Sequence, residues 1–136
     1  MKKFLKICSV LLALSVIMNM TVILAEEADF ADVSEGDYFY NAVKWGVESG
    51  ITYGMDEEHF NPQGEVTRAQ AVTFLWRMQG EPQPTATETF ADVEQGSWYE
   101  TAVAWAVENE ITAGTGDNMF SPQVICDRAM CITLLF

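Results

Sequence analysis

The stretch FADVSEGDYFYNAVKWGVESGITYG runs from Phe30 to Gly54, and it occurs a second time as FADVEQGSWYETAVAWAVENEITAG from Phe90 to Gly114. When residues 30–76 are laid over residues 90–136 without a gap, 20 of the 47 aligned positions are identical. Such agreement at a fixed period is typical of repeat architectures, in which each copy is one small structural unit. We therefore expect two copies of one fold rather than two unrelated domains.

Each copy carries the pattern of two short helices. Apolar residues of the first copy recur at Phe39, Ala42, Val43, Gly46 and Val47, and the second copy repeats this stripe 60 residues later. The spacing places them on one face of a helix. A second helix closes each copy. Because one such pair has too little apolar surface to fold alone, we expect stacked copies to share a core, which gives an all-α fold of tandem helix-loop-helix units.

The start of the second helix is marked in both copies. Thr67 is a favourable N-cap, and Gln70 lies three residues further on, so the pattern predicts a capping box. In the second copy Asp127 is the N-cap, but Met130 cannot complete the box. The second helix should therefore begin at the same place in both copies, with a weaker signal in the second.

The end of the first helix differs between the copies. Gly50 can end the helix of the first copy in a left-handed conformation. The second copy has Asn109 and Glu110 at this point, and Asn109 could take that role only if the helix end shifts by one residue.

The first 25 residues are unlike the repeats. Three lysines among the first six positions precede an apolar run over residues 7–24, and Ala25 is a small residue suited to cleavage. This pattern is typical of a secretory signal peptide, with a retained membrane anchor as the alternative. After cleavage, four cationic and 20 acidic side chains would remain. So acidic a chain should not bind nucleic acid, and we expect no membrane association of the cleaved form.

These signals divide the chain into four segments. Residues 1–25 are the expected signal peptide, residues 30–78 the first repeat and residues 90–136 the second. The linker between the repeats, residues 79–89, is rich in Pro and Thr and lacks apolar periodicity. The second repeat ends early, because its last residue falls within its second helix.

The repeated motifs resemble a known family. Phe-Ala-Asp-Val, then an aromatic residue, Ala-Val-x-Trp-x-Val-Glu, Phe-x-Pro and Thr-Arg-Ala-Gln together resemble the S-layer homology (SLH) repeat. The resemblance covers both copies and implies a helical bundle of pseudo-threefold symmetry, usually built from three repeats and incomplete with two. It also implies a secreted, non-catalytic module of the bacterial cell wall or S-layer. The implied partner is an acidic secondary cell-wall polysaccharide, which often bears pyruvate ketals.

The resemblance implies a set of ligand-binding residues in the grooves between neighbouring repeats. These are the aspartate of the opening motif, the aromatic residue after it and the arginine of the last motif: Asp32, Tyr38 and Arg68 in the first copy, and Asp92, Trp98 and Arg128 in the second. The second set is the less regular one, because Cys126-Asp127 replaces Val66-Thr67 and Met130 replaces Gln70.

Both arginines stand in the first turn of a helix, where the helix dipole disfavours a positive charge. A guanidinium beside the free N–H groups of a helix start could bind the carboxylate of a pyruvylated sugar. The alternative for these arginines is a structural ion pair, for instance with Asp32 or Asp92, and an aspartate could also orient an arginine that binds a ligand.

The aromatic residues also have two interpretations. Tyr38 and Trp98 could stack on the face of a sugar, or they could pack in the core beside the first helix. Trp45 and Trp105 lie inside the first helix of each copy, and we expect them to pack between helices.

The two cysteines of the second repeat form a further candidate site. Cys126 and Cys131 take the N′ and N4 positions of their helix, which touch in a hydrophobic staple. Export permits oxidation, so a short disulfide is one hypothesis and a pair of free thiols is the other.

The sequence offers little for metals, cofactors or catalysis. The two cysteines and His59 make a poor metal site, and Asp56, Glu57 and Glu58 lack the alternating spacing of a calcium loop. The chain carries neither a Ser-His-Asp set nor a phosphate-binding loop. We therefore expect no metal, no cofactor and no enzymatic activity.

Two other interpretations of the function stay open at this point. The repeats could form a structural module that assembles with copies of itself or with other SLH repeats, without binding sugar. A truncated fragment without function is the third interpretation.

Overall fold

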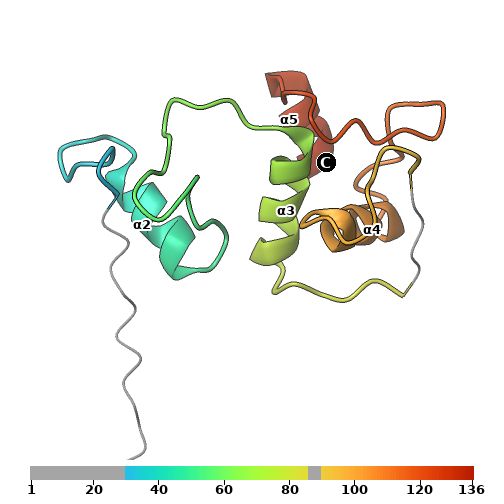
Figure 1. Cartoon of the computed structure of the whole chain (residues 1–136), viewed down its shortest axis with the longest axis horizontal. Coiled ribbons are helices and arrows are strands. Elements are labelled where there is room, and N and C mark those ends of the chain that lie inside the picture. Colours follow the sequence, from blue (N-terminus) through green and yellow to red (C-terminus); the bar gives the residue numbers. More distant parts are fainter. Residues whose placement is uncertain (1–29, 86–89) are drawn as a thin grey trace, which may run out of the picture.

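The computed structural model describes residues 30–85 and 90–136, and these ranges are helical with long connecting loops (Figure 1). The four helices are α2 (Tyr40–Glu48), α3 (Arg68–Met78), α4 (Glu100–Glu108) and α5 (Arg128–Leu135). Only isolated β-bridges accompany them in the described ranges. The expected all-α fold with two helices in each repeat is therefore confirmed. The predicted signal peptide and residues 86–89 of the linker lie outside the described residues.

The second helix of each repeat begins as predicted. At α3, the side chain of Thr67 accepts a hydrogen bond from the amide of Gln70, and the Gln70 side chain accepts one from the amide of Thr67. At α5, the carboxylate of Asp127 accepts from the amide of Met130 at 2.8 Å. The reciprocal bond is confined to the first repeat, because Met130 has no acceptor that could replace Gln70.

The end of the first helix is a point of difference. Gly50 is left-handed, with φ of 69°, as expected. In the second repeat Glu110 takes the same conformation, with φ of 60°, and Asn109 remains the C-cap with φ of −95°. The helix end therefore does not shift toward Asn109. A glutamate occupies a conformation that glycine adopts at a lower energetic cost.

The main core lies between the repeats rather than within one of them. The last helix of the first repeat, α3, packs on the first helix of the second repeat, α4, and α5 lies alongside (Figure 1). The fully buried centre of this core joins Val72 from α3 to Val103 from α4 and to Phe120 from the loop before α5. The expectation that the copies share one core is thus confirmed.

Helix α2 stands apart from this core (Figure 1). Near it Phe30, Val43 and Ile51 are buried. The equivalent tryptophans of α2 and α4 differ in burial, since Trp105 on α4 is 7% exposed and Trp45 on α2 is 56% exposed. The expected packing holds for Trp105 and is wrong for Trp45, because no helix of the described ranges covers α2 on that side.

Candidate functional site at the joint between the repeats

The start of α3 is bonded to the loop of the other repeat. The amide of Arg68 donates to the carbonyl of Val124 at 2.8 Å, and the amide of Ala69 donates to the carbonyl of Pro122 at 3.0 Å. These are among the N–H groups that a helix start leaves without a partner inside the helix. Since the loop already uses them, an anionic ligand cannot bind to these two groups of α3.

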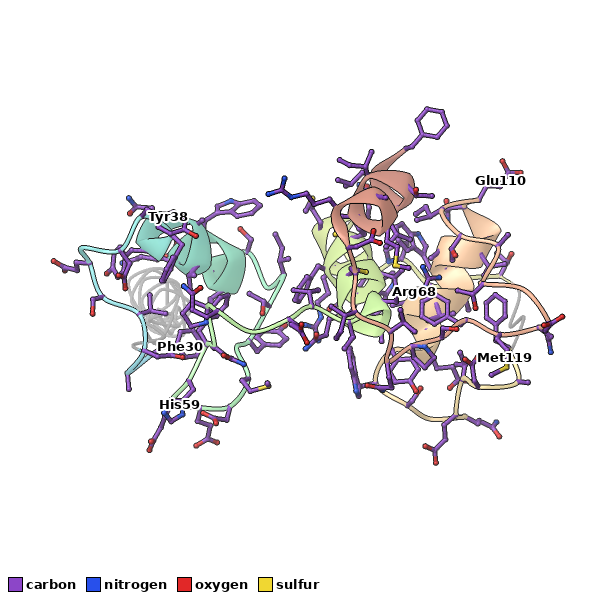
Figure 2. All side chains as sticks on the ribbon, turned by 90° about the horizontal axis from the view of Figure 1, so that it is seen from above. Phe30, Tyr38, His59, Arg68, Glu110 and Met119 are labelled. Atoms are coloured by element: carbon purple, nitrogen blue, oxygen red, sulfur yellow. The ribbon has the colours of Figure 1, made fainter. Side chains whose placement is uncertain are left out.

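The side chain of Arg68 belongs to this contact between the start of α3 and the second repeat, which we call the joint. It is 6% exposed, and it lies between α3 and the second repeat (Figure 2). Its Nε donates to the carbonyl oxygen of Phe120 at 3.0 Å, and its Nη2 donates to Oγ1 of Thr112 at 3.4 Å. The guanidinium carbon also lies 4.8 Å from the centroid of the Phe120 ring, a cation–π geometry. The positive charge is thus compensated by a carbonyl dipole and a ring face of the second repeat.

The aspartate of the opening motif holds the loop that Arg68 contacts. The carboxylate of Asp92 accepts from the amides of Phe120 at 2.8 Å and Ser121 at 2.7 Å. Asp32 makes the same two bonds in its own repeat, at 2.9 and 2.8 Å. The amide of Phe60 is the largest cause that lowers the pKa of Asp32 below its ordinary value. Both aspartates therefore brace a Phe-x-Pro loop.

This arrangement decides the ion-pair alternative. Arg68 bonds to the carbonyl of Phe120 and Asp92 bonds to its amide, so the two side chains hold one residue from opposite sides. The interpretation of Arg68 as the ion-pair partner of Asp32 or Asp92 is wrong for the described residues. The structure instead groups the candidate residues across repeats, with Arg68 of the first repeat beside the loop that Asp92 of the second holds.

The candidate aromatic residues are exposed. Tyr38 is 95% exposed and Trp98 is 57% exposed, so neither is a core residue. Each ring stands edge-on against its neighbour: Trp98 on Tyr99 with centroids 5.1 Å apart and planes at 86°, and Tyr38 on Phe39 at 5.0 Å and 79°. The two repeats thus present an aromatic ring in the same pose.

Arg128 differs from Arg68 although it occupies the equivalent position. Its side chain is exposed. Among the described residues, the amides of Arg128 and Ala129 have no hydrogen-bond partner, whereas Asp127 caps the amide of Met130. The combination of a free guanidinium and open helix N–H groups therefore occurs at α5 and not at α3.

The two cysteines are free thiols in the structure. Burial is the largest cause that raises the pKa of the Cys126 thiol, and the neighbouring Cys131 raises it further, partly through a hydrogen bond between the two side chains. Their proximity fits the staple positions. The disulfide between them stays a prediction.

Sequence reasoning missed two parts of this region. Thr112 and Phe120 contact Arg68, and only the repetition of the Phe-x-Pro motif could have suggested the second of them. A groove of about 660 Å³ also opens between the C-terminal ends of α3, α4 and α5, with Leu75, Trp105 and Leu134 among its walls. No sequence signal marks this groove, because its walls come from three separate segments.

Metal and membrane features can be assessed for residues 30–85 and 90–136. These ranges contain no group of three or more His, Cys, Asp or Glu side chains that could hold a metal ion. His59 instead pairs with Asp56 at 3.0 Å, and this pairing raises the pKa of His59. None of the helices described here has the length and apolar character needed to cross a bilayer.

Comparison with known proteins identifies the class. The S-layer homology domain model matches residues 29–72 and 89–129, so the chain belongs to the SLH family. This domain is a non-catalytic anchoring module, and the chain is a secreted cell-surface module of the S-layer type.

Individual relatives agree with this assignment. The chain is 34% identical over 107 residues to the S-layer protein sap of Bacillus anthracis, a match that covers 78% of the chain and 13% of the relative. It is 32% identical over 114 residues to an S-layer protein of Bacillus thuringiensis subsp. finitimus, covering 83% and 14%. A match to the exoglucanase XynX of Acetivibrio thermocellus, 27% identical, covers 82% of the chain and 11% of the enzyme. The chain thus corresponds to a small part of each of these proteins.

Proposed function

We propose that this SLH module attaches to the cell surface by binding an acidic secondary cell-wall polysaccharide, including pyruvylated forms, without catalysis. The observation that carries the proposal is the pair of exposed aromatic rings at Tyr38 and Trp98, held edge-on by the residue after each. An exposed ring fixed in orientation offers a flat apolar face on which the C–H surface of a sugar can pack.

The acidic groups of the polymer require a cation. The chain has a formal net charge of −13, so it repels an acidic polymer except where a positive group is accessible. Arg128 meets this requirement best, because its guanidinium is exposed and the amides of Arg128 and Ala129 are open beside it. A guanidinium can bind a carboxylate through two parallel hydrogen bonds. Arg68 serves the site indirectly, by holding the second repeat in place.

Co-sedimentation with purified cell-wall sacculi tests the proposal. We expect the chain to sediment with sacculi that carry secondary polysaccharide and to remain in solution after the polysaccharide is removed chemically. Trp98→Ala should reduce sedimentation at least about tenfold, the effect of losing one well-placed aromatic contact. Trp45→Ala is the matched control, since Trp45 is 56% exposed and Trp98 is 57% exposed, and no ring of the described residues stands edge-on against Trp45. Sedimentation that survives polysaccharide removal would contradict the proposal.

A second candidate function is structural assembly with other SLH repeats, without sugar binding. The open faces of α2 and α5 favour it. The two candidates have separate measurements, because polymer binding requires sacculi and assembly is observed without them.

A further inference from the structure

Helices α3 and α5 occupy equivalent positions in the two repeats, but one face that is covered on α3 is exposed on α5. On α3, Val72 is 0% exposed and its neighbours Ala69 and Thr73 are also buried. The equivalent Ile132 on α5 is 66% exposed, and Ala129 and Thr133 are exposed as well. The residue types on the two helices are alike. The hydroxyl of Thr73 donates to the carbonyl of Ala69, and the hydroxyl of Thr133 donates in the same way to the carbonyl of Ala129. Helix α5 therefore carries the contact face of α3, and no described residue covers this face.

The first repeat carries the complementary surface, also uncovered. On α4, Ala102 is 0% exposed and belongs to the core that α4 shares with α3, whereas the equivalent Ala42 on α2 is exposed. Trp45 is exposed where Trp105 is buried. Within residues 30–85 and 90–136, the chain thus has one unfilled receptor for an α3-like helix, at α2, and one unpartnered α3-like helix, at α5.

We propose that α5 of one copy docks on α2 and on the loop of residues 60–66 of a second copy, and so repeats between chains the joint that α3 and α4 form within one chain. The occupant is a second copy because the same chain presents both halves of this joint. The two surfaces are different, so the association is head-to-tail, and each dimer keeps one open face of either kind.

The internal joint specifies the polar contacts of the proposed one. Arg68 bonds to the carbonyl of Phe120 and the hydroxyl of Thr112, and the equivalent acceptors in the first repeat are Phe60 and Thr52, identical in type. Arg128 of one copy should therefore donate to Phe60 and Thr52 of the next. In such a dimer the cation left for the polymer is Arg128 of the copy whose α5 face stays open.

The backbone of the joint can be repeated as well. The amides of Arg128 and Ala129, which lack partners in the described part of the chain, should donate to the carbonyls of Gly64 and Pro62 of the other copy. In the internal joint the corresponding amides of α3 bond to the carbonyls of Val124 and Pro122.

One feature opposes the association. Within the chain, Thr67 faces Ile125 across an isolated antiparallel bridge. The equivalent pair between copies is Asp127 and Glu65, two carboxylates directly opposite each other. Like charges in this position weaken the pairing, so replacing Glu65 with the isoleucine of the second repeat should strengthen it.

The test is the oligomeric state of the secreted chain, in about 0.15 M salt to screen its net charge. We expect sedimentation velocity to show association between about 1 µM and about 500 µM, a range suited to an interface of modest area. Ala42→Glu blocks the α2 face and Ile132→Glu blocks the α5 face. Both side chains are exposed, so the fold should persist. Each change should weaken self-association at least about thirtyfold.

Mixing the variants identifies the arrangement. The Ala42→Glu chain keeps its α5 face and the Ile132→Glu chain keeps its α2 face, so an equimolar mixture should restore dimers and nothing larger. Glu65→Ile should strengthen association up to about fivefold. Met119→Glu is the control, because this exposed loop residue belongs to the second repeat, whose joint is already formed (Figure 2). The equivalent position of the first repeat has the polar His59, so a polar side chain should be tolerated.

Three outcomes would overturn the proposal. The first is a monomer at every concentration, which would leave both faces to repeats of a different chain. The second is loss of association with Ile132→Glu but not with Ala42→Glu, which would mean a symmetric α5–α5 contact. The third is a mixture of the two variants that stays monomeric.

Discussion

Arg68 and Arg128 begin equivalent helices, but Arg68 is buried under the second repeat while Arg128 is exposed to solvent. The difference lies in the segment that comes after each helix along the chain. After α3 comes a repeat whose Phe120 carbonyl and Thr112 hydroxyl receive the guanidinium. Among the described residues, nothing takes that place for α5. The arginine of the motif thus connects the two repeats at Arg68 and is an accessible cation at Arg128.

The two arginines should therefore respond differently to the same substitution. Arg68→Ala removes a buried guanidinium together with its two hydrogen bonds, and it leaves the Phe120 carbonyl without this donor. We expect the free energy of unfolding to fall by about 2–4 kcal/mol. Arg128→Ala removes an exposed side chain and should change it by no more than about 0.5 kcal/mol.

Urea unfolding followed by circular dichroism measures both effects on the same scale. A similar loss in the two variants would mean that Arg128 also has a structural partner. A small loss in Arg68→Ala would mean that the joint does not depend on the guanidinium.

Glu110 provides a second prediction, on the end of α4. This residue is left-handed with φ of 60°, and it places a negative charge after a helix C-terminus, where the helix dipole disfavours one. Glu110→Gly should therefore raise the free energy of unfolding by about 0.5–1 kcal/mol. Glu110→Ala separates the two causes, because it removes the charge and keeps the strained backbone. If alanine stabilises as much as glycine, the charge rather than the backbone is the cause.

The reciprocal change tests the same position in the first repeat. Gly50 has φ of 69°, and a β-carbon there would meet nothing closer than the hydroxyl of Tyr53 at 3.7 Å. Since there is space for the methyl group, the cost of Gly50→Ala is that of the backbone conformation, about 1 kcal/mol. No measurable cost would mean that the helix end can shift.

The parts of the fold that depend on local chemistry could be predicted from the sequence. The capping box of Thr67 and Gln70 needs only residues three apart, and the apolar stripe needs only helical periodicity. The partner of Arg68 could not be predicted in this way, because Phe120 lies 52 residues away and offers a backbone carbonyl, which every residue has. The conformation of Glu110 was missed for a different reason. The fold places this residue at the helix end against its own preference, and tertiary packing carries that cost.

Ligand binding by the candidate residues stays a prediction, and their grouping depends on how the repeats pack. The family resemblance assigned them to grooves between neighbouring repeats, one set to each copy, without saying which residues of the two copies meet. The structure forms its joint between repeats, so Arg68 belongs with the second repeat. Only the packing of α3 on α4 shows that Arg68 meets the second repeat, because the spacing in the sequence is compatible with a contact in either repeat.

Acid should weaken the first repeat through Asp32. Hydrogen bonds from backbone amides, that of Phe60 first, lower the pKa of this carboxyl in the folded chain below its ordinary value of 3.8. The ionised form therefore stabilises the fold above that value, and the stabilisation is lost as the pH falls toward the lower pKa of the folded state. Asp32→Asn should lower stability at neutral pH and should flatten its decline in acid.

Urea midpoints between about pH 5 and about pH 2 measure this dependence. Asp117→Asn is the control, since Asp117 is an exposed loop acid and an asparagine tolerates its left-handed backbone. A decline that is equally steep in wild type and Asp32→Asn would mean that other carboxylates cause it.

The last prediction concerns the thiol of Cys126. Burial raises its pKa, and Cys131 adds to the shift, so little thiolate is present at neutral pH. Because the thiolate is the reactive form, alkylation by iodoacetamide should be slow near neutral pH and should accelerate as the pH approaches the raised pKa. Mass spectrometry of a pH series follows this rate, and Cys131→Ala should accelerate the reaction by removing the neighbour that raises the pKa. Rapid alkylation at neutral pH would show that partial burial and Cys131 do not raise the pKa of Cys126. In the chain without residues 1–25, and so without Cys8, a mass lower by two hydrogens before reduction would establish the disulfide with Cys131. It closes so short a loop that it should add only about 2 kcal/mol to stability.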